Sequence, residues 1–284
     1  MTRLKRYLRN IRNRLLTRFL NTRPGRNLLI EVISPRTRTM TVDLGDHVMT
    51  FSPSDYIGRS LFTKGHFDRD HVDRLLDIMQ KRALPMQGKA LLELGGNIGT
   101  HTVYFALTKV FSRIVSVEPD PRNYPLLLTN IAQNGFDALV VPVNCAAGDA
   151  EGEIDFYLHP TNHGRSSPMR RNDTDLRIAV PVKPVSSILE QAGVSADDIG
   201  LVWMDIEGYE PVAIRSMQSL LERRVPIYTE FTPEFYGFEQ ATEFVRFLST
   251  FYEDCLVFFE DVETPMKVRD IPVGKQQFDI LLLP

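Results

Sequence analysis

The sequence predicts an α/β protein with a mostly parallel sheet that carries helices on both faces. From residue 89 onward, short apolar runs alternate with amphipathic segments, the pattern of repeated strand–helix units. The expected strands are 90–94, 114–117, 139–143, 201–204, 227–230, 255–259 and 278–282. The expected helices lie near 99–109, 124–134, 185–192, 211–223 and 239–251. No full helix fits between the last two strands, so they favour a hairpin in which one strand runs antiparallel.

The N-terminal segment, residues 3–20, predicts a basic amphipathic helix that ends at Pro24-Gly25. Its apolar residues recur at helical spacing, and arginines occupy much of the rest of the surface. One interpretation is peripheral contact with an anionic membrane, at its inner face. The other is packing on the chain's own domain or on a second subunit of a homo-oligomer.

An extension over residues 27–86 is expected to follow, with 1–26 as the helix and 87–284 as the α/β domain. Three β-like runs, 29–33, 40–44 and 47–51, predict a small antiparallel meander. A helix from about Asp70 to Arg82 closes the extension.

Charge and composition exclude several classes of protein. Residues 1–30 carry nine Arg or Lys and no acid, which leaves 24 basic and 36 acidic residues, a net charge of −12, in the rest of the 284-residue chain. An acidic body argues against a nucleic-acid partner. Cys145 and Cys255 lack metal-ligand spacing, and no apolar run is long enough to span a bilayer. With no secretory signal pattern, the cytoplasm is the expected compartment.

A glycine-rich turn, Gly95–Gly99, joins the strand 90–94 to the next helix. Glycines let the backbone approach a ligand closely, and the helix N-terminus offers free N–H donors. The following strand ends in Glu118, whose carboxylate can accept hydrogen bonds from both hydroxyls of a ribose. A dinucleotide fingerprint needs a glycine where Asn97 stands, so the turn favours S-adenosylmethionine, which has no phosphate.

The expected cofactor site draws on the glycine turn, on the polar groups near it and on two later strand ends. Glu93 and Asn97 are expected to bind the amino-acid end of the cofactor, and His101 to pack beside it. Asn144 is placed either to contact adenine or to cap a turn. The full set is Glu93, Gly95, Gly96, Asn97, Gly99, Thr100, His101, Glu118, Asn144 and Asp205.

Acidic residues gather where two later strands end. Asp205, Glu207 and Glu210 follow the strand 201–204, and Glu230 ends the next strand. Because the carboxyl ends of parallel strands meet at one edge, Asp205 should face the same crevice as Gly95. The acids could take a proton, bind the cofactor's amino group or hold a divalent metal, although no metal is predicted. Glu207 and Glu210 could instead cap the helix that starts at Pro211.

The polar segment 159–172 interrupts two β-like runs and is expected to cover the acceptor site. It contains His163, a further candidate base, although a solvated loop histidine is the more common case. The candidate catalytic residues are therefore Asp205, Glu207, Glu230 and His163.

Three motifs together resemble the FkbM-type methyltransferases: Glu93–Gly99, Val117–Asn123 and Trp203–Glu210. The resemblance spans roughly residues 55–284 and includes the lead-in Tyr56–Phe62, with Gly96 in place of the family's usual alanine. It implies the class I methyltransferase, Rossmann-like fold, a seven-stranded mostly parallel sheet with one antiparallel strand. It also implies methyl transfer from S-adenosylmethionine to a hydroxyl of a sugar, glycoconjugate or natural product, with Asp205 and Glu207 near the methyl group.

Two other functions stay open. A nicotinamide-dependent oxidoreductase could use a similar sheet, although Asn97 argues against it. A non-catalytic cofactor-binding module is the other alternative, and the presence of Glu93, Glu118 and Asp205 in the expected places argues against that. The expected partner is a small-molecule or glycan acceptor that carries a hydroxyl, with no nucleic acid.

Overall fold

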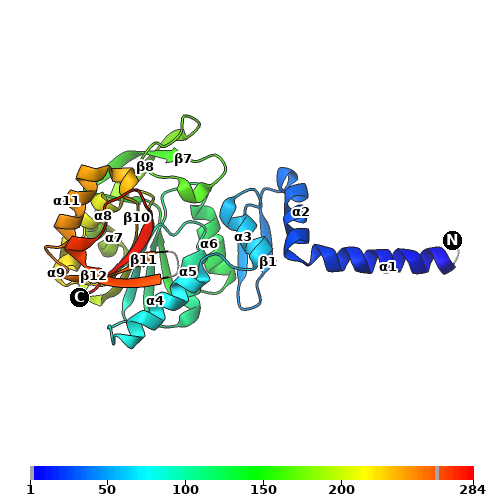
Figure 1. Cartoon of the computed structure of the whole chain (residues 1–284), viewed down its shortest axis with the longest axis horizontal. Coiled ribbons are helices and arrows are strands. Elements are labelled where there is room, and N and C mark those ends of the chain that lie inside the picture. The colour runs from blue at the N-terminus through cyan, green and yellow to red at the C-terminus, as the bar shows by residue number, and fades with distance from the viewer. Residues whose placement is uncertain (1–2, 260–261) are drawn as a thin grey trace. The chain divides into compact units, whose positions relative to one another are not determined.

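A computed structural model describes residues 3–259 and 262–284, apart from the side chains of residues 3–5 and 8 (Figure 1). The chain divides into two compact units, one up to Arg69 and one from Asp70 onward. Within the described residues, no helix is both long and apolar enough to cross a membrane.

Among the described residues, the first unit contains three α-helices, one short 3-10 helix and one hairpin. They are α1 (Arg3–Leu20), α2 (Arg23–Ile33), the short η1 (Ser34–Arg36), β1 (Met40–Asp43), β2 (Val48–Phe51) and α3 (Tyr56–Lys64). The predicted helix over 3–20 is confirmed by α1. The strands β1 and β2 pair antiparallel, with Met40 opposite Phe51.

The predicted strand at 29–33 is wrong, because these residues form the second half of α2. Thr22 caps this helix by accepting the N–H of Gly25 at 3.2 Å, and Pro24 lies in its first turn. Both features start helices, so Pro24 begins α2 as well as ending α1. The meander is therefore a two-stranded hairpin.

The second unit is built on an eight-stranded sheet in the order β12-β11-β13-β10-β9-β3-β4-β5. The strands are β3 (Ala90–Leu94), β4 (Arg113–Val117), β5 (Val140–Val143), β9 (Ile199–Met204), β10 (Ile227–Phe231), β11 (Asp254–Phe259), β12 (Val262–Lys267) and β13 (Phe278–Leu282). Strands β5, β4, β3, β9 and β10 pair in parallel, while β13 is antiparallel to both β10 and β11. This is the expected class I arrangement.

One strand of this sheet was not predicted. β12 pairs antiparallel with β11 and forms the edge, so the sheet has eight strands rather than seven. The predicted antiparallel pairing of the last two strands is confirmed, with Cys255 opposite Leu282.

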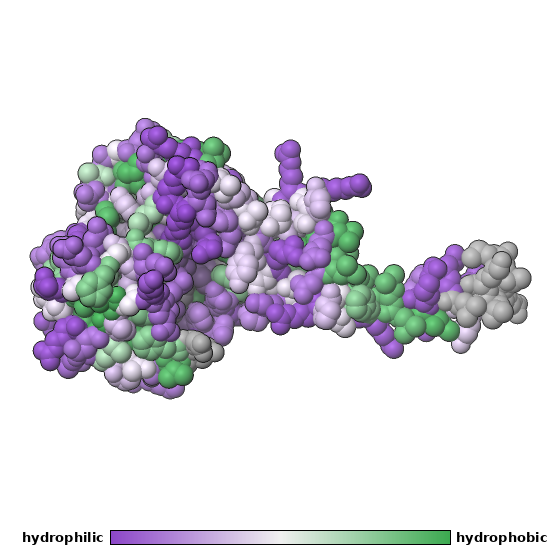
Figure 2. Space-filling model, turned by 45° about the horizontal axis from the view of Figure 1, so that its top comes forward, coloured by the Kyte–Doolittle hydropathy of each residue, from purple (hydrophilic) through white to green (hydrophobic). Residues whose placement is uncertain are grey.

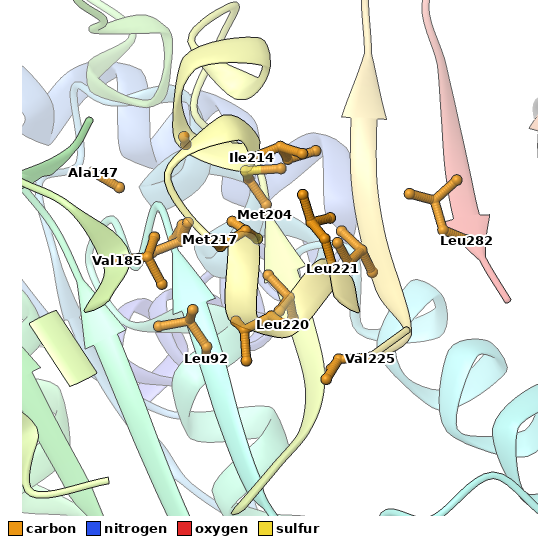
Figure 3. Close-up of a cluster of buried hydrophobic side chains, with 14 of the residues drawn as sticks. Leu92, Ala147, Val185, Met204, Ile214, Met217, Leu220, Leu221, Val225 and Leu282 are labelled. Carbon is orange, nitrogen blue, oxygen red and sulfur yellow. The ribbon is translucent and has the colours of Figure 1, made fainter. Parts of the chain in front are cut away.

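Helices pack on both faces of the sheet. The buried side chains of α4 (Arg69–Lys81), α5 (Thr100–Thr108) and α6 (Tyr124–Gln133) join one core cluster. Those of α7 (Val185–Ala192), α8 (Glu210–Arg215), α9 (Gln218–Glu222) and α11 (Phe238–Leu248) join another, part of which is drawn in Figure 3. The predicted helix 211–223 is thus two short helices. The helix after Asp70, assigned from sequence to the extension, packs its Leu75 and Met79 in the same cluster as Leu91 of the sheet.

A smaller sheet of three strands, in the order β6-β8-β7, adds to this unit. Its strands are β6 (Ala146–Ala147), β7 (Gly152–Leu158) and β8 (Leu176–Lys183), and β7 pairs antiparallel with β8. The two β-like runs that flank the polar segment are therefore strands, and residues 159–175 connect them as a long hairpin loop.

Candidate active site

The glycine turn after β3 brings the ends of two neighbouring strands into close contact. Gly95 has a φ of +92°, and a Cβ built on it would lie 1.9 Å from the backbone oxygen of Asp205, the residue after β9. Gly99 has a φ of +88°, and its Cβ would lie 2.9 Å from Leu127. Both the left-handed backbone and the missing Cβ are therefore needed, which explains why glycine stands at these positions.

Glu118 links this turn to the end of β4. Its Oε2 accepts the backbone N–H of Asn97 at 2.7 Å, and its Oε1 accepts the N–H of Asp120, also at 2.7 Å. Only 5% of the residue is exposed. Burial, and secondarily the nearby Asp120 carboxylate, raise the pKa of Glu118 to about 8. The carboxyl group is thus fixed in orientation by two main-chain donors.

A pocket that is partly open to solvent lies over the carboxyl ends of β3, β4, β5 and β9. Six residues singled out from the sequence line it: Gly95, Asn97, Glu118, His163, Asp205 and Glu207. The structure therefore brings the glycine turn, the carboxylate after β4 and the acidic turn after β9 to one cavity.

The other candidates lie outside the lining of this pocket. Glu93 is fully buried and accepts the hydroxyl of Thr102 at 2.5 Å; burial raises its pKa to about 6. A Cβ on Gly96 would lie 2.3 Å from the hydroxyl of Ser116, so Gly96 permits close packing of β3 against β4. Thr100 is also buried, in the first turn of α5.

His101 and Asn144 occupy supporting positions. The ring of His101 packs against Trp203 with centroids 4.9 Å apart, and burial lowers the pKa of His101 to about 4, so the imidazole is neutral. Asn144 donates from Nδ2 to the carbonyl oxygen of Glu118 at 2.7 Å. It thereby ties the ends of β4 and β5 together, which fits the capping alternative, and adenine contact stays a prediction.

Glu210 organises the acidic turn after β9. It is 1% exposed, and its carboxyl group accepts the N–H of Ile206 at 3.1 Å, the N–H of Gly208 at 2.9 Å and the hydroxyl of Tyr236 at 2.7 Å. Burial raises its pKa. Glu210 is thus the internal brace of the turn rather than a cap of α8, which has no side-chain cap, and the turn holds Asp205 on the pocket wall.

Glu230 lies beside this turn, at the end of β10. Burial, followed by the negative charges of Asp205 and Glu207, raises the pKa of Glu230 well above its usual value. Gln277 donates a hydrogen bond to its Oε1. Glu230 is not part of the pocket lining, so its influence on the site is electrostatic.

The segment between β7 and β8 lines the pocket through His163, Gly164, Ser166 and Pro168. One side of it is held by Arg122, which donates to the hydroxyl of Ser166 and to the carbonyl of His159, both at 2.9 Å. Arg122 is oriented by the buried Asp120, at 2.7 Å. The loop is therefore connected to the motif that follows Glu118.

The other side of the same loop is held by Arg171. Its Nη1 lies 2.6 Å from Oε2 of Glu207, and its guanidinium lies 3.6 Å from the ring centroid of Phe235. Glu207 itself has a φ of +56°, an uncommon conformation for this residue type. The loop thus bridges the two sides of the pocket through two arginines.

Sequence reasoning missed several lining residues, among them Pro119, Cys145, Ala146, Phe156 and Tyr209. Burial raises the pKa of the Cys145 thiol to about 11, so this thiol is neutral. Within the part of the chain that the structure describes, no group of three or more His, Cys, Asp or Glu side chains is arranged to hold a metal ion.

Comparison with known proteins points to one family. The sequence matches the profile of the Methyltransferase FkbM domain over residues 93–261. No curated protein matches it. A methyltransferase FkbM from Methylobacillus flagellatus has 15% identity and a TM-score of 0.44, over 69% of this chain and 43% of that one. A putative O-methyltransferase from Klebsiella pneumoniae has 12% identity and a TM-score of 0.43, over 76% and 79% of the two chains.

The chain spans less than half of the length of the first of these structures. The family profile covers more than half of the present chain, including the glycine turn, Glu118 and the acidic turn. The chain belongs to the FkbM methyltransferase family.

Proposed function

We propose that the protein transfers the methyl group of S-adenosylmethionine to a hydroxyl oxygen of a sugar, glycoconjugate or natural product. The observation that carries the proposal is that one pocket joins the fixed carboxyl group of Glu118 to Asp205 across the glycine turn. The carboxyl group of Glu118 is suited to bind the ribose of the cofactor. The carboxylate of Asp205 is suited to accept a proton beside the reacting methyl group.

The residues present fit S-adenosylmethionine. Each oxygen of Glu118 accepts one main-chain N–H and retains a lone pair for a ribose hydroxyl. Val117, Pro119 and Ala146 give the wall next to Glu118 an apolar surface suited to adenine. The carboxylates of Asp205 and Glu207 favour a bound cation. When bound, the sulfonium group supplies an electrophilic methyl carbon.

Two of the four candidate bases suit the role less well. Glu207 is paired with Arg171, and Glu230 lies outside the pocket lining, so both act on the site indirectly. The remaining candidates, Asp205 and His163, both line the pocket. Asp205 follows β9, and His163 lies in the loop after β7. We assign the proton of the acceptor hydroxyl to Asp205, because the turn that Glu210 braces fixes its position.

The proposed compartment is the cytoplasm. Cys145 and Cys255 are both buried free thiols, and reduced cysteines are the norm in a reducing compartment.

The test is methyl transfer by the purified full-length chain from methyl-labelled S-adenosylmethionine to a panel of free sugars, nucleotide sugars, lipid-linked glycans and hydroxylated natural products. We expect label in a base-stable methyl ether. Asp205→Asn should lower the rate by about 100-fold or more, because general-base catalysis contributes that much. Asp137→Asn, at an exposed carboxylate away from the pocket, is the matched control.

Two outcomes would contradict the assignment. Label recovered only in methyl esters, methylamines or nucleic acid would show that the acceptor atom or class is different. Full activity of Asp205→Asn combined with loss of activity in His163→Gln would move the base to the loop.

A further inference from the structure

The helix α1 presents an apolar side that the first unit does not bury. Every described side chain from Arg6 to Phe19 is exposed. The large apolar ones are included: Tyr7 is 62% exposed, Ile11 38%, Leu15 60% and Phe19 45%. These four residues are spaced by four positions, so they follow one another along the same side of the helix. In Figure 2, patches of apolar colour alternate with polar ones along this helix.

The remaining surface of α1 is strongly basic. The helix has seven basic residues and no acidic residue: Arg3, Lys5, Arg6, Arg9, Arg12, Arg14 and Arg18. An isolated helix with this charge gains nothing from internal ion pairs, because it has no acid to supply them. Both the charge and the exposed apolar side therefore call for a partner that is anionic and apolar at once.

The junction with α2 anchors this helix to a folded unit. Gly25 in the first turn of α2 has no Cβ, and one built there would lie 2.0 Å from the carbonyl oxygen of Phe19, the last but one residue of α1. Thr22 caps α2 between them and also donates its hydroxyl to the carbonyl of Phe19 at 2.6 Å. A surface that binds α1 is thus connected through a tight turn to the rest of the first unit.

We propose that α1 lies in the interface of an anionic lipid bilayer, with Ile11, Leu15 and Phe19 among the acyl chains and the guanidinium groups at the lipid phosphates. Such a surface is the partner that offers a dense negative charge and an apolar layer together. Long arginine stems can cover apolar surface while their heads stay with the phosphates. α1 is not apolar enough to cross the bilayer, which fits a helix lying along its surface.

Other occupants fit α1 less well. A nucleic acid would neutralise the arginines but leave Ile11, Leu15 and Phe19 in water. A second copy of the helix would cover the apolar side but would bring seven like charges against seven. These occupants are separate outcomes of the test below.

The test uses the full-length chain and vesicles of phosphatidylcholine, with or without phosphatidylglycerol, in a flotation assay. We expect binding to the anionic vesicles, loss of binding at high salt and little binding to the neutral ones. Replacing Arg9, Arg12, Arg14 and Arg18 with Gln should weaken binding by about 100-fold or more. The same four residues changed to Lys keep the charge and should keep most of the affinity.

A second variant tests the apolar side separately. Leu15→Ser with Phe19→Ser leaves every charge in place and should still lower vesicle binding by at least about 10-fold. Thermal unfolding of the Gln, Lys and Ser variants, compared with the parent chain, checks that the fold is intact.

Three results would overturn the proposal. The first is equal binding to neutral and anionic vesicles, or no binding to either. The second is unchanged binding of the serine variant, which would reduce the contact to charge alone and favour nucleic acid, measured with a duplex competitor. The third is α1-dependent self-association in sedimentation, with no vesicle binding, which would assign the helix to a second copy of the chain.

Discussion

The carboxylate of Glu118 accepts the backbone N–H of Asn97 at 2.7 Å, so the end of β4 is tied to the glycine turn after β3. Asn97 has a φ of +51°, and the hydrogen bond holds its main chain in this uncommon conformation. The same carboxyl group lies on the pocket wall. The relationship therefore sets both the shape of the turn and the place where a ribose would bind.

Removal of this carboxyl group should weaken cofactor binding. Glu118→Ala takes away two acceptors for ribose hydroxyls and leaves the N–H of Asn97 without its present partner. We expect the dissociation constant for S-adenosylmethionine to rise several-fold, measured by calorimetry. Glu151→Ala, at an exposed glutamate, is the control. Unchanged affinity in the Glu118 variant would remove the ribose assignment.

Binding of the ribose should depend on pH. Because the pKa of Glu118 is raised to about 8, its carboxyl group is mostly protonated at pH 6 and ionised at pH 9. The ionised form is the better acceptor for hydroxyl donors, so affinity should rise with pH and level off above 8. Adenosine is the right probe because it has the ribose but no group that titrates in this range.

The size of this effect has an upper limit. Below the pKa, affinity rises at most about tenfold per pH unit if only the ionised form binds. Glu118→Gln cannot ionise, and its binding should be flat with pH. If the parent chain and Glu118→Gln show the same pH dependence of binding, another group causes it.

The close approach of Gly95 to β9 makes a strong stability prediction. In Gly95→Ala, the new Cβ would overlap the carbonyl oxygen of Asp205, in addition to the cost of a positive φ. Gly135→Ala is a matched control, since Gly135 has a φ of +72° but no atom near the position of a Cβ. In urea unfolding, Gly95→Ala should lower the free energy of unfolding by at least about 2 kcal/mol more than Gly135→Ala does. Equal losses would mean that the two strand ends are not in contact.

The loop after β7 should matter for the acceptor more than for the cofactor. Arg171→Gln breaks the ion pair with Glu207, which lines the pocket, and the contact with Phe235. We expect KM for the acceptor to rise by about 10-fold, with cofactor affinity nearly unchanged. Arg170→Gln changes an exposed arginine on the same loop and serves as the control. A loss of cofactor affinity in the Arg171 variant would contradict this division of roles.

The sheet could be predicted because its inner strands are buried on both faces. In β3, Leu91 and Leu92 join the core clusters on opposite faces and both are fully buried, so this strand is apolar apart from Glu93. The edge strand β12 has no such run: it contains Pro265, is largely exposed and pairs only with β11. The apolar run 29–33 resembles the inner strands in sequence, and the signals for a helix, the cap at Thr22 and Pro24 in the first turn, lie several residues before it.

The pocket residues, too, could be predicted from the sequence only in part. Gly95, Asn97 and Glu118 lie in short motifs whose spacing alone places them at neighbouring strand ends. Cys145 and Ala146 line the pocket but look like core residues in the sequence. Tyr209 lies inside the acidic motif, and this position is the one indication in the sequence that it lines the pocket. The pair of Arg122 and Ser166 joins residues far apart in the chain, so it appears only in the folded structure.

A calorimetric titration of the purified chain with S-adenosylmethionine, beside one with a nicotinamide dinucleotide, tests whether the pocket binds the proposed cofactor. We expect micromolar binding of S-adenosylmethionine, about −8 kcal/mol, and no binding of the dinucleotide. If S-adenosylmethionine does not bind, the proposed chemistry is contradicted, and a protein with the methyltransferase fold but no catalytic activity is favoured. Binding of the dinucleotide alone would point to an oxidoreductase instead.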